Sequence, residues 1–555
     1  MPREGRILIV DDLKKWRKEL TETLEHNGYI ADAVSTSEEV LERLEKSHYH
    51  ILLLDIRLYS SDPKNVGGIA LLAELDKRGL GEAIKVITIS AFGNREQVRT
   101  LFREYEVADC LFKNAFTRED FLKSVEQVLS QQVNINLGLL IHWQPRSNLE
   151  QTLLELEVNR IRLQPDTHFH KQIALEMDDL LCRLFYKAES ILIRPLTSGR
   201  SGTGVLRVQP FYRANGGGRE VVVKFGDVQQ IDEEHDNYKK YVQPFLGSGR
   251  NTVVLAIRHT PHLGGIIYSL LGTNNTQLMD FGAFYRRAPL SRIRSTIESL
   301  FWQTCGDWYA NPGHLQPLDL AADYQHWYGD LSEKVGPLLT KLLKNVRGRK
   351  KLRLTSLHSN RTFTNPFLAT KGVTLVRPTY TCITHGDFNQ YNVLVDSNDN
   401  TWLIDFQQVG TSHILRDVAT LDSVIRFQLL MSEEASLEER LEMEEVLCSI
   451  DHFSQVRLLT TKFSTSNKTL ERTYMTVLHL RTLAQRLVEH NPADDISEYY
   501  IALLYNAMKT VKYNTLQPVQ REHALLSASL LADRLGLDKP ETRATHFRDN
   551  ESSKT

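Results

Sequence analysis

Short apolar runs alternate with amphipathic segments over the first quarter of the chain. Residues 6–10, 51–54 and 85–89 are uninterrupted apolar runs that predict buried strands, and residues 13–26 and 37–46 carry apolar side chains at helical spacing. Strands and helices in alternation indicate a parallel sheet covered by helices on both faces. We therefore expect an α/β doubly wound domain with a five-stranded parallel sheet over residues 1–131.

The pattern changes after residue 131. Leucines and isoleucines recur at helical spacing in residues 148–163 and 171–185, which predicts a helical connector over residues 132–186. A strand-rich, glycine-punctuated segment follows, and from residue 277 onward the pattern is mostly helical. Strands are expected at residues 191–194, 205–208, 220–225, 253–258, 374–375 and 382–384. The polar residues 546–555 lack periodicity and are expected to form a disordered tail.

Length and composition narrow the class of protein. A chain of 555 residues is too long for one core and suggests about three or four domains. A formal charge of −2 gives no electrostatic reason to expect nucleic acid or an anionic membrane as partner. The five cysteines lie far apart without a CxxC pair, which excludes a zinc ribbon and fits reduced thiols. With no apolar stretch of membrane-spanning length, we expect a cytoplasmic protein.

Carboxylates stand at the ends of two predicted strands. Asp11 and Asp12 end the first strand, and Asp55 ends the strand at 51–54. The carboxyl ends of parallel strands gather at one edge of a sheet, so these side chains are expected to converge. Three carboxylates in one pocket repel one another unless a divalent cation neutralises them. Mg²⁺ suits oxygen ligands and can also bridge an incoming phosphoryl group.

Two further groups complete this chemistry. Ser90 ends the strand at 85–89 and can donate to a phosphoryl oxygen, and Lys113 follows a short strand at 109–112 and can place an ammonium on another. Together the set resembles the receiver domain of bacterial response regulators over about residues 5–130. The resemblance implies that Asp11 and Asp12 hold Mg²⁺ and that a sensor histidine kinase or phosphotransfer protein phosphorylates Asp55. It implies a switch role for Ser90 and Lys113, and leaves a receiver-mediated homodimer open.

The resemblance has three departures. Asn114 stands where the family normally has proline, and Cys110 occupies the place of the usual switching aromatic residue. The loop over residues 58–68 is several residues longer than usual. The phosphorylation chemistry is therefore expected to be intact, with a changed conformational readout.

A second set of residues begins with a glycine loop at 198–205. Glycines allow backbone N–H groups to surround phosphate oxygens. Lys224 interrupts an apolar strand two strands later and needs a partner, which is Glu234 or the adjacent Glu233 in an acidic helix. The candidate nucleotide-binding residues are Ser198, Gly199, Ser201, Gly202, Gly204, Lys224 and Glu234.

The most specific motif is His-Gly-Asp at residues 385–387, with Asn392 five residues after Asp387 and a strand that ends in Ile-Asp-Phe at 404–406. Phosphoryl transfer from ATP needs a carboxylate to orient the attacking hydroxyl, and an amide and a second carboxylate to hold Mg²⁺. Asp387 suits the first task, and Asn392 and Asp405 suit the second.

The region from about residue 187 to 540 resembles the aminoglycoside phosphotransferase and choline kinase branch of the kinase-like fold. The resemblance implies a two-lobed α+β domain over 187–545 with a largely helical C-terminal lobe and a hinge near residues 268–272. It assigns Lys224 to the ATP phosphates, Asp387 as catalytic base, Asn392 and Asp405 to Mg²⁺, and a structural role to Asp417. More than a hundred residues separate the hinge from His385 and no Ala-Pro-Glu activation loop follows, so the acceptor is expected to be small.

The sequence therefore predicts a two-component signalling protein. Its receiver would regulate a phosphotransferase that uses ATP and Mg²⁺ on an unidentified hydroxyl acceptor. One alternative is a scaffold whose kinase-like domain binds nucleotide without transferring phosphate. A protein kinase is a third hypothesis, and the missing activation loop argues against it.

Overall fold

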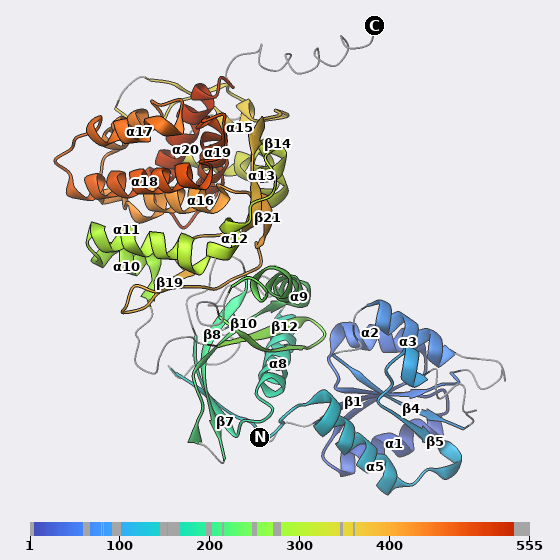
Figure 1. The fold of residues 1–555 in the computed structure, drawn as a ribbon. Coiled ribbons are helices and arrows are strands. Elements are labelled where there is room, and N and C mark those ends of the chain that lie inside the picture. The colour runs from blue at the N-terminus through green and yellow to red at the C-terminus, as the bar shows by residue number, and fades with distance from the viewer. Residues whose placement is uncertain are drawn as a thin grey trace. The chain divides into compact units, whose positions relative to one another are not determined.

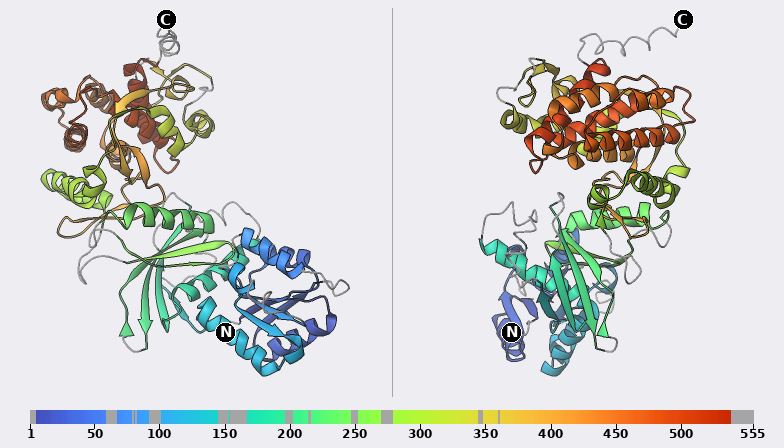
Figure 2. Two further views of the ribbon diagram at one scale, coloured as in Figure 1. Left: turned by 45° about the vertical axis from the view of Figure 1, so that its right-hand side comes forward. Right: turned by 90° about the vertical axis from the view of Figure 1, so that its left-hand side faces the viewer.

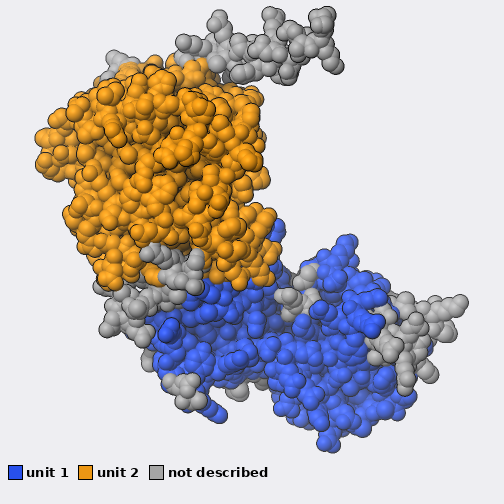
Figure 3. Space-filling model, in the orientation of Figure 1, with its two compact units in different colours: residues 1–235, 253–270 blue, residues 236–252, 271–555 orange. Residues whose placement is uncertain are grey.

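The chain forms two compact units, residues 1–235 with 253–270 and residues 236–252 with 271–555 (Figure 3). The structure, a computed structural model, describes residues 5–58, 67–78, 80, 83–91, 101–144, 153, 167–195, 202–213, 216–246, 252–269, 279–343, 348–358 and 361–537.

Unit 1 begins with a five-stranded parallel sheet in the order β2-β1-β3-β4-β5, which confirms the predicted receiver architecture (Figure 1). Buried residues form one core layer on each face of this sheet. The strands are β1 Arg6–Val10, β2 Ile30–Val34, β3 Ile51–Asp55, β4 Lys85–Ser90 and β5 Asp109–Phe112. The helices are α1 Lys14–His26, α2 Ser37–Lys46, α3 Gly67–Lys77 and α5 Arg118–Gln127, the last continued by a helical segment Val128–Val133.

A second sheet in unit 1 has the order β11-β12-β10-β8-β7-β6, with β9 paired to β8. All of its pairs are antiparallel except β6 with β7, which is parallel. The strands are β6 Leu140–Trp143, β7 Ser190–Pro195, β8 Gly204–Tyr212, β9 Gly216–Gly217, β10 Val221–Asp227, β11 Val254–His259 and β12 Leu263–Ser269. Helix α9 spans Val228–Asn237.

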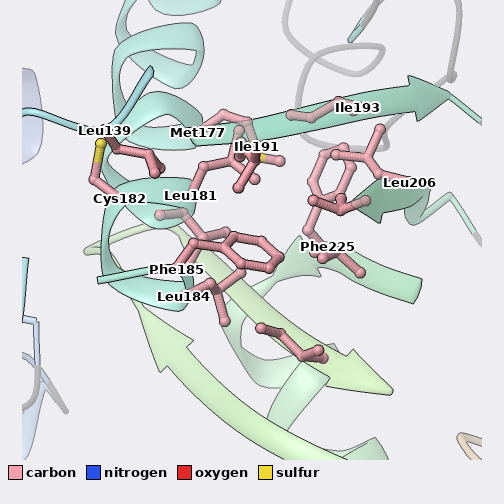
Figure 4. Close-up of a cluster of buried hydrophobic side chains, with 14 of the residues drawn as sticks. Leu139, Met177, Leu181, Cys182, Leu184, Phe185, Ile191, Ile193, Leu206 and Phe225 are labelled. Carbon is pink, nitrogen blue, oxygen red and sulfur yellow. The ribbon is translucent and has the colours of Figure 1, made fainter. Parts of the chain in front are cut away.

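Helix α8, Thr167–Leu184, packs against this sheet (Figure 4). Met177, Leu181 and Phe185 point from the helix side toward Ile191 of β7 and Phe225 of β10. All five side chains are buried, so this cluster joins the helix to the centre of the sheet and contributes a hydrophobic free energy proportional to the apolar area removed from water.

The expected connector at 132–186 is not helical throughout. Residues 140–143 form strand β6, because their backbone pairs in parallel with residues 190–193 of β7. Four residues are too few to show a periodicity, and their strand state depends on this distant partner. The helix expected at 171–185 is present as α8, while the expected helix at 148–163 lies, apart from Leu153, outside the described residues.

Unit 2 consists mainly of helices, as its sequence predicts, and its C-terminal helices pack side by side (Figure 2). The helices are α10 Phe281–Arg287, α11 Leu290–Ser299, α12 Gly306–Ala310, α13 Leu320–Tyr328, α14 Leu331–Leu342, α15 Pro366–Ala369, α16 Arg416–Ser423, α17 Leu437–Leu447, α18 Lys468–Leu487, α19 Ser497–Val511 and α20 Pro518–Arg534. Further helical segments span Tyr238–Val242, Leu300–Thr304, Val424–Leu429, Ser432–Glu434 and Phe453–Thr461.

Short antiparallel strands interrupt the helices of unit 2. They form the small sheets β13-β19-β20, β14-β17, β15-β16 and β18-β21. The strands are β13 Met279–Asp280, β14 Gln316–Asp319, β15 Lys351–Leu352, β16 Phe363–Thr364, β17 Val376–Thr379, β18 Thr381–Thr384, β19 Val393–Val395, β20 Thr401–Leu403 and β21 Gly410–His413. The strand expected at 374–375 is displaced to β17.

Among the helices that the structure describes, none combines the length and apolar character needed to cross a membrane. Tyr268, at the start of the expected hinge, lies within β12, and residues 270–272 of that hinge lie outside the described residues. Residues 59–66 of the long receiver loop and the expected tail at 546–555 lie outside them as well.

Candidate functional site

The three receiver carboxylates meet at the carboxyl edge of the first sheet. Val10 pairs with Leu54, so Asp11 and Asp55 leave neighbouring strands side by side. A carboxylate oxygen from each of Asp11, Asp12 and Asp55 lies within 4.8 Å of the others. Oxygen atoms at such separations form the donor set that Mg²⁺ prefers, and the expected residues fit this ion.

Lys113 joins this cluster from the end of β5. Its Nζ lies 2.5 Å from Asp11 Oδ2 and 2.7 Å from Asp55 Oδ2. Burial raises the pKa of both carboxyls above the ordinary value, and the ammonium of Lys113 offsets only part of this effect. Ser90 ends β4 opposite Phe112 and is buried. The acidic and ammonium groups predicted for a phosphoryl-accepting site thus meet at this edge, and Ser90 ends the neighbouring strand.

Gly68 has a role that the sequence did not suggest. A Cβ atom at Gly68 would lie 2.6 Å from the backbone oxygen of Asp55 and 2.8 Å from Ile56 Cα. The first turn of α3 therefore lies directly against the backbone that carries Asp55, and a side chain at residue 68 would push the two apart.

Lys224 forms a buried ion pair in the second sheet of unit 1. Its Nζ lies 2.6 Å from Glu234 Oε2, and Tyr268 donates a hydrogen bond of 2.6 Å to Glu234 Oε1. Of the two candidate partners, Glu234 is thus the residue on α9 that Lys224 contacts, because Glu233 is exposed and accepts from Gln229. The pair holds the ammonium at a defined place on the central strand β10.

The glycine loop is described only in part. Gly202 has φ +75°, which favours glycine, and a Cβ at Gly204 would lie 2.2 Å from the ring of Phe225. Gly204 therefore has a packing reason to be glycine, independent of any phosphate. Ser198, Gly199 and Ser201 lie outside the described residues.

In unit 2 the His-Gly-Asp turn and the β19–β20 hairpin bring the predicted catalytic and metal residues together. The Nδ2 group of Asn392 donates to Asp387 at its backbone oxygen (3.0 Å) and at Oδ2 (3.1 Å), and Asn389 Nδ2 donates to the same Oδ2 at 2.8 Å. The backbone N–H of Ile404 donates to the backbone oxygen of Asn392 at 3.1 Å. Asp405 directly follows Ile404, so this hydrogen bond holds the backbone of Asp405 close to Asn392. Asp405 has φ +68°, an uncommon conformation for a non-glycine residue that concentrates at functional sites.

Asp417, for which the resemblance implied a structural role, holds this turn. Its two carboxylate oxygens accept hydrogen bonds of 2.7 Å from the backbone N–H groups of His385 and Gly386, and Tyr309 donates to it at 2.8 Å. Gly386 has φ +79°, and a Cβ there would lie 2.4 Å from Arg416 Nη2. The turn thus needs both a buried acceptor and a glycine.

Lys509 is a site residue that the sequence reasoning missed. It reaches Asp387 from α19, with its Nζ 3.4 Å from Asp387 Oδ1 and 4.5 Å from the ring centroid of Tyr328. Burial would raise the pKa of Asp387, but the charges of Lys509 and His385 and the Asn389 hydrogen bond outweigh it and hold that pKa below its ordinary value. The available signal was a lysine within a largely apolar and buried helix, comparable to the lysine in an apolar strand that identified Lys224.

The geometry of this turn suits orientation of a hydroxyl more than strong basicity. Asp387 remains charged and is fixed by three hydrogen-bond donors. The side-chain amide oxygen of Asn392 and the carboxylate of Asp405 are hard oxygen ligands of the kind that Mg²⁺ binds.

Two family models match the chain. A response regulator receiver domain matches residues 7–126, and ternary complex associated domain 9 matches residues 188–338 and 339–512. The chain is also similar to the transcriptional regulatory protein PmrA of Pectobacterium parmentieri, at 30% identity over 83 residues, or 15% of this chain and 35% of the relative. The two-component response regulator PhoP of Pseudomonas aeruginosa is 29% identical over 89 residues, or 16% and 36%. The chain spans about a third of the length of these relatives.

Solved structures match about a quarter of the chain. A response regulator receiver domain protein from Methanospirillum hungatei is 25% identical, with 23% of this chain and 96% of that chain covered and a TM-score of 0.21. The signal receiver domain of an HD domain-containing protein from Pseudomonas fluorescens is 19% identical, with coverage of 23% and 98% and a TM-score of 0.21.

Proposed function

The chain belongs to the ternary complex associated domain 9 family and carries a response regulator receiver domain, and from this premise we propose that it is a two-component signalling protein with a regulated phosphotransferase domain. In this proposal a sensor histidine kinase or phosphotransfer protein phosphorylates Asp55, and residues 187–545 form a kinase-like domain. That domain transfers phosphate from ATP to a hydroxyl acceptor, with Mg²⁺ as cofactor.

The observation that carries the proposal is that Asp387, Asn392 and Asp405 lie close to one another in unit 2. Backbone hydrogen bonds of the β19–β20 hairpin and the turn that Asp417 stabilises set the positions of these three residues. Asn392 and Asp405 would hold Mg²⁺ on the phosphates, and Asp387 would orient the acceptor hydroxyl. The positive φ of Asp405 supports this assignment, because a fold retains such a conformation where surrounding contacts enforce it.

The Lys224–Glu234 pair supports the nucleotide half of the proposal. A buried lysine costs free energy unless it is paired, and Glu234 supplies the charge while Tyr268 fixes that carboxylate. Lys224 would place its ammonium on the ATP phosphates. The acceptor would be small, since the segment that follows Asp405 has no sequence typical of a protein-kinase activation loop.

A scaffold without phosphotransfer is the second candidate. The observation that favours it is that the Asp387 carboxylate already accepts from Asn389, Asn392 and Lys509. A carboxylate bonded in this way can serve to hold the turn together.

Two variants of the intact chain separate the candidates. We expect Asp387→Ala to leave ATP affinity nearly unaltered and to lower the slow hydrolysis of ATP by on the order of a hundredfold, because this carboxylate contacts the acceptor or water and not the phosphates. Lys224→Met should lower both ATP affinity and turnover. The exposed Asp307→Ala on α12 is the matched control and should behave as the parent protein. If Asp387→Ala hydrolyses ATP at the parental rate, the catalytic assignment is wrong and the scaffold is favoured.

A further inference from the structure

Helix α8 carries a buried charged face in addition to its apolar one. Glu176, Asp179 and Arg183 are 0%, 7% and 2% exposed. Their spacing of three and four residues places them on one side of the helix. Buried charges are retained only where partners satisfy them, so the contacts of these three side chains define what α8 holds together.

Asp179 binds two histidines of the receiver. Its Oδ2 accepts from His48 Nε2 at 2.6 Å and from His50 Nε2 at 2.5 Å, and both histidines are buried. Arg183 Nη2 donates to the backbone oxygen of Ala83 at 3.0 Å. His50 immediately precedes β3 and Ala83 precedes β4, so α8 is attached to the amino edge of the receiver sheet, opposite the edge that carries Asp55.

The proton positions favour a hydrogen-bonded clamp over a metal site. The backbone N–H of Arg6 donates to His50 Nδ1 at 2.9 Å, so Nδ1 carries the lone pair and Nε2 carries the proton. That proton is donated to Asp179, and a metal ion would need the Nε2 lone pair instead. Burial lowers the pKa of His50, which keeps the ring neutral, and the two histidines hold the pKa of Asp179 well below its usual range despite burial.

The same helix face contacts the β11–β12 turn. Glu176 Oε2 accepts from the hydroxyl of Thr260 at 2.9 Å and from the backbone N–H of His262 at 3.0 Å, while Glu176 Oε1 lies 2.6 Å from His262 Nδ1. Arg183 Nη1 donates to the backbone oxygen of His259 at 3.1 Å. Arg183 therefore bridges the receiver and β11 with its two terminal nitrogens.

Helix α8 also lies close to β12 through its apolar side. A Cβ at Gly265 would be 3.0 Å from both Leu180 Cδ2 and Leu184 Cδ1, so the glycine allows this approach. β12 pairs with β10 along its length, and Ile266 of β12 is the partner of Lys224. A shift of α8 would therefore displace β12, the strand that pairs with Lys224, through direct side-chain contacts.

We propose that α8 is the output element of the receiver: it carries the phosphorylation state of Asp55 from the His48/His50–Asp179 clamp to the β11–β12 turn. β3 links the two ends of the receiver, since it begins directly after His50 and ends at Asp55, a run of five strand residues that is about 17 Å long. α8 thus contacts the receiver at the edge opposite the one that carries Asp55. The inference rests on the proposed function only in requiring that Asp55 accept the phosphoryl group.

The test uses hydrogen–deuterium exchange of the intact chain with and without Mg²⁺ and beryllium fluoride, a stable analogue of the aspartyl phosphate. In the parent protein we expect slower exchange around Asp55 and a change of about threefold or more in the β11–β12 turn. Asp179→Asn should keep the response around Asp55 and lose the response at β11–β12. Asp178→Asn, which removes one charge from the same turn of α8, is the matched control and should retain both responses.

A second variant covers the case in which Asp179→Asn fails to fold. His262→Gln alters the other end of the path, at a partly exposed side chain, and should likewise abolish only the β11–β12 response. The inference is overturned if β11–β12 responds in both variants as in the parent, or if the parent responds at Asp55 and not at β11–β12. A parent protein that shows no response at Asp55 contradicts the proposed function instead.

Discussion

At residue scale, Gly386 occupies a position that only glycine can take, because of both its backbone conformation and its close neighbours. Its φ of +79° and the 2.4 Å approach of Arg416 Nη2 and Gln408 O leave no room for a Cβ. We expect Gly386→Ala to destabilise unit 2 by more than the roughly 1–2 kcal/mol of the left-handed conformation alone, because the overlap displaces Arg416. Gly372→Ala, with φ +66° and no atom within 4 Å of the added Cβ, isolates the backbone effect. If urea unfolding shows the same loss of unfolding free energy for the two variants, Arg416 moves aside without a measurable loss of stability.

Asp55 provides the second residue-scale prediction. Its carboxylate lies with Asp11, Asp12 and Lys113 at the carboxyl edge of the receiver sheet. Incubation with labelled acetyl phosphate and Mg²⁺ should label the parent protein, and Asp55→Asn should reduce labelling to background. Asp120→Asn, at an exposed position in the first turn of α5, should label normally. Undiminished labelling of Asp55→Asn would assign the phosphoryl group to another residue.

At element scale, α19 contributes a charge to a turn that lies far from it in sequence. Lys509 stands between Met508 and Thr510 of this helix and lies 3.4 Å from Asp387. The pair keeps Asp387 ionised, since burial on its own raises the pKa of that carboxyl. A helix that is distant in sequence therefore helps to set the charge of the candidate catalytic group.

We expect Lys509→Met to raise the pKa of Asp387 and to move the acid limb of the pH–rate profile for ATP hydrolysis to higher pH. The sign follows because the carboxylate form is active and is lost as pH falls through its pKa. Lys512→Met, at the C-terminal end of the same helix, should leave the limb in place. An unchanged limb in Lys509→Met would mean that Asp387 does not control the rate.

At the scale of the whole molecule, buried charge networks tie the helices of unit 2 together. His523 of α20 lies 2.9 Å from Glu444 of α17, and Glu444 also accepts from Arg426 and from Ser527. Arg440 Nη1 lies 3.2 Å from His523 Nδ1 and can only donate, so the neutral ring donates from Nε2 to Glu444. Burial lowers the pKa of His523 from 6.5 to about 4.

This depressed pKa predicts acid sensitivity of the intact chain. The stabilisation is fully present above pH 6.5, because His523 is then neutral in both states, and is lost as pH falls toward about 4 and only the unfolded chain is protonated. The contribution is about 3 kcal/mol in all. Urea unfolding between these pH values should show a shallower pH dependence for His523→Gln, while His490→Gln, at an exposed side chain, should follow the parent. Parallel slopes for all three proteins would remove His523 from the acid transition.

The sequence by itself determined the receiver architecture, and it named the candidate residues of both sites apart from Lys509. Apolar runs ending in Asp11, Asp55 and Ser90 predict strands whose ends share an edge, and β1 and β5 agree with the expected residues. Asp387, Asn392 and Asp405 likewise lie close together in sequence, in the turn before the β19–β20 hairpin and at the two ends of that hairpin. These inferences succeed because strand periodicity, strand ends and the spacing within one turn are local properties, and a parallel sheet then brings the strand ends to one edge.

The tertiary structure alone decided several other contacts between side chains that are distant in sequence. Asp179 binds His48 from 131 residues away, and Lys509 reaches Asp387 from 122 residues away. Strand β6 exists because β7 pairs with it, and the choice of Glu234 over Glu233 depends on which side of α9 faces β10. No local pattern encodes such contacts, since their free energy comes from burial and pairing that arise only when the helices and sheets pack together.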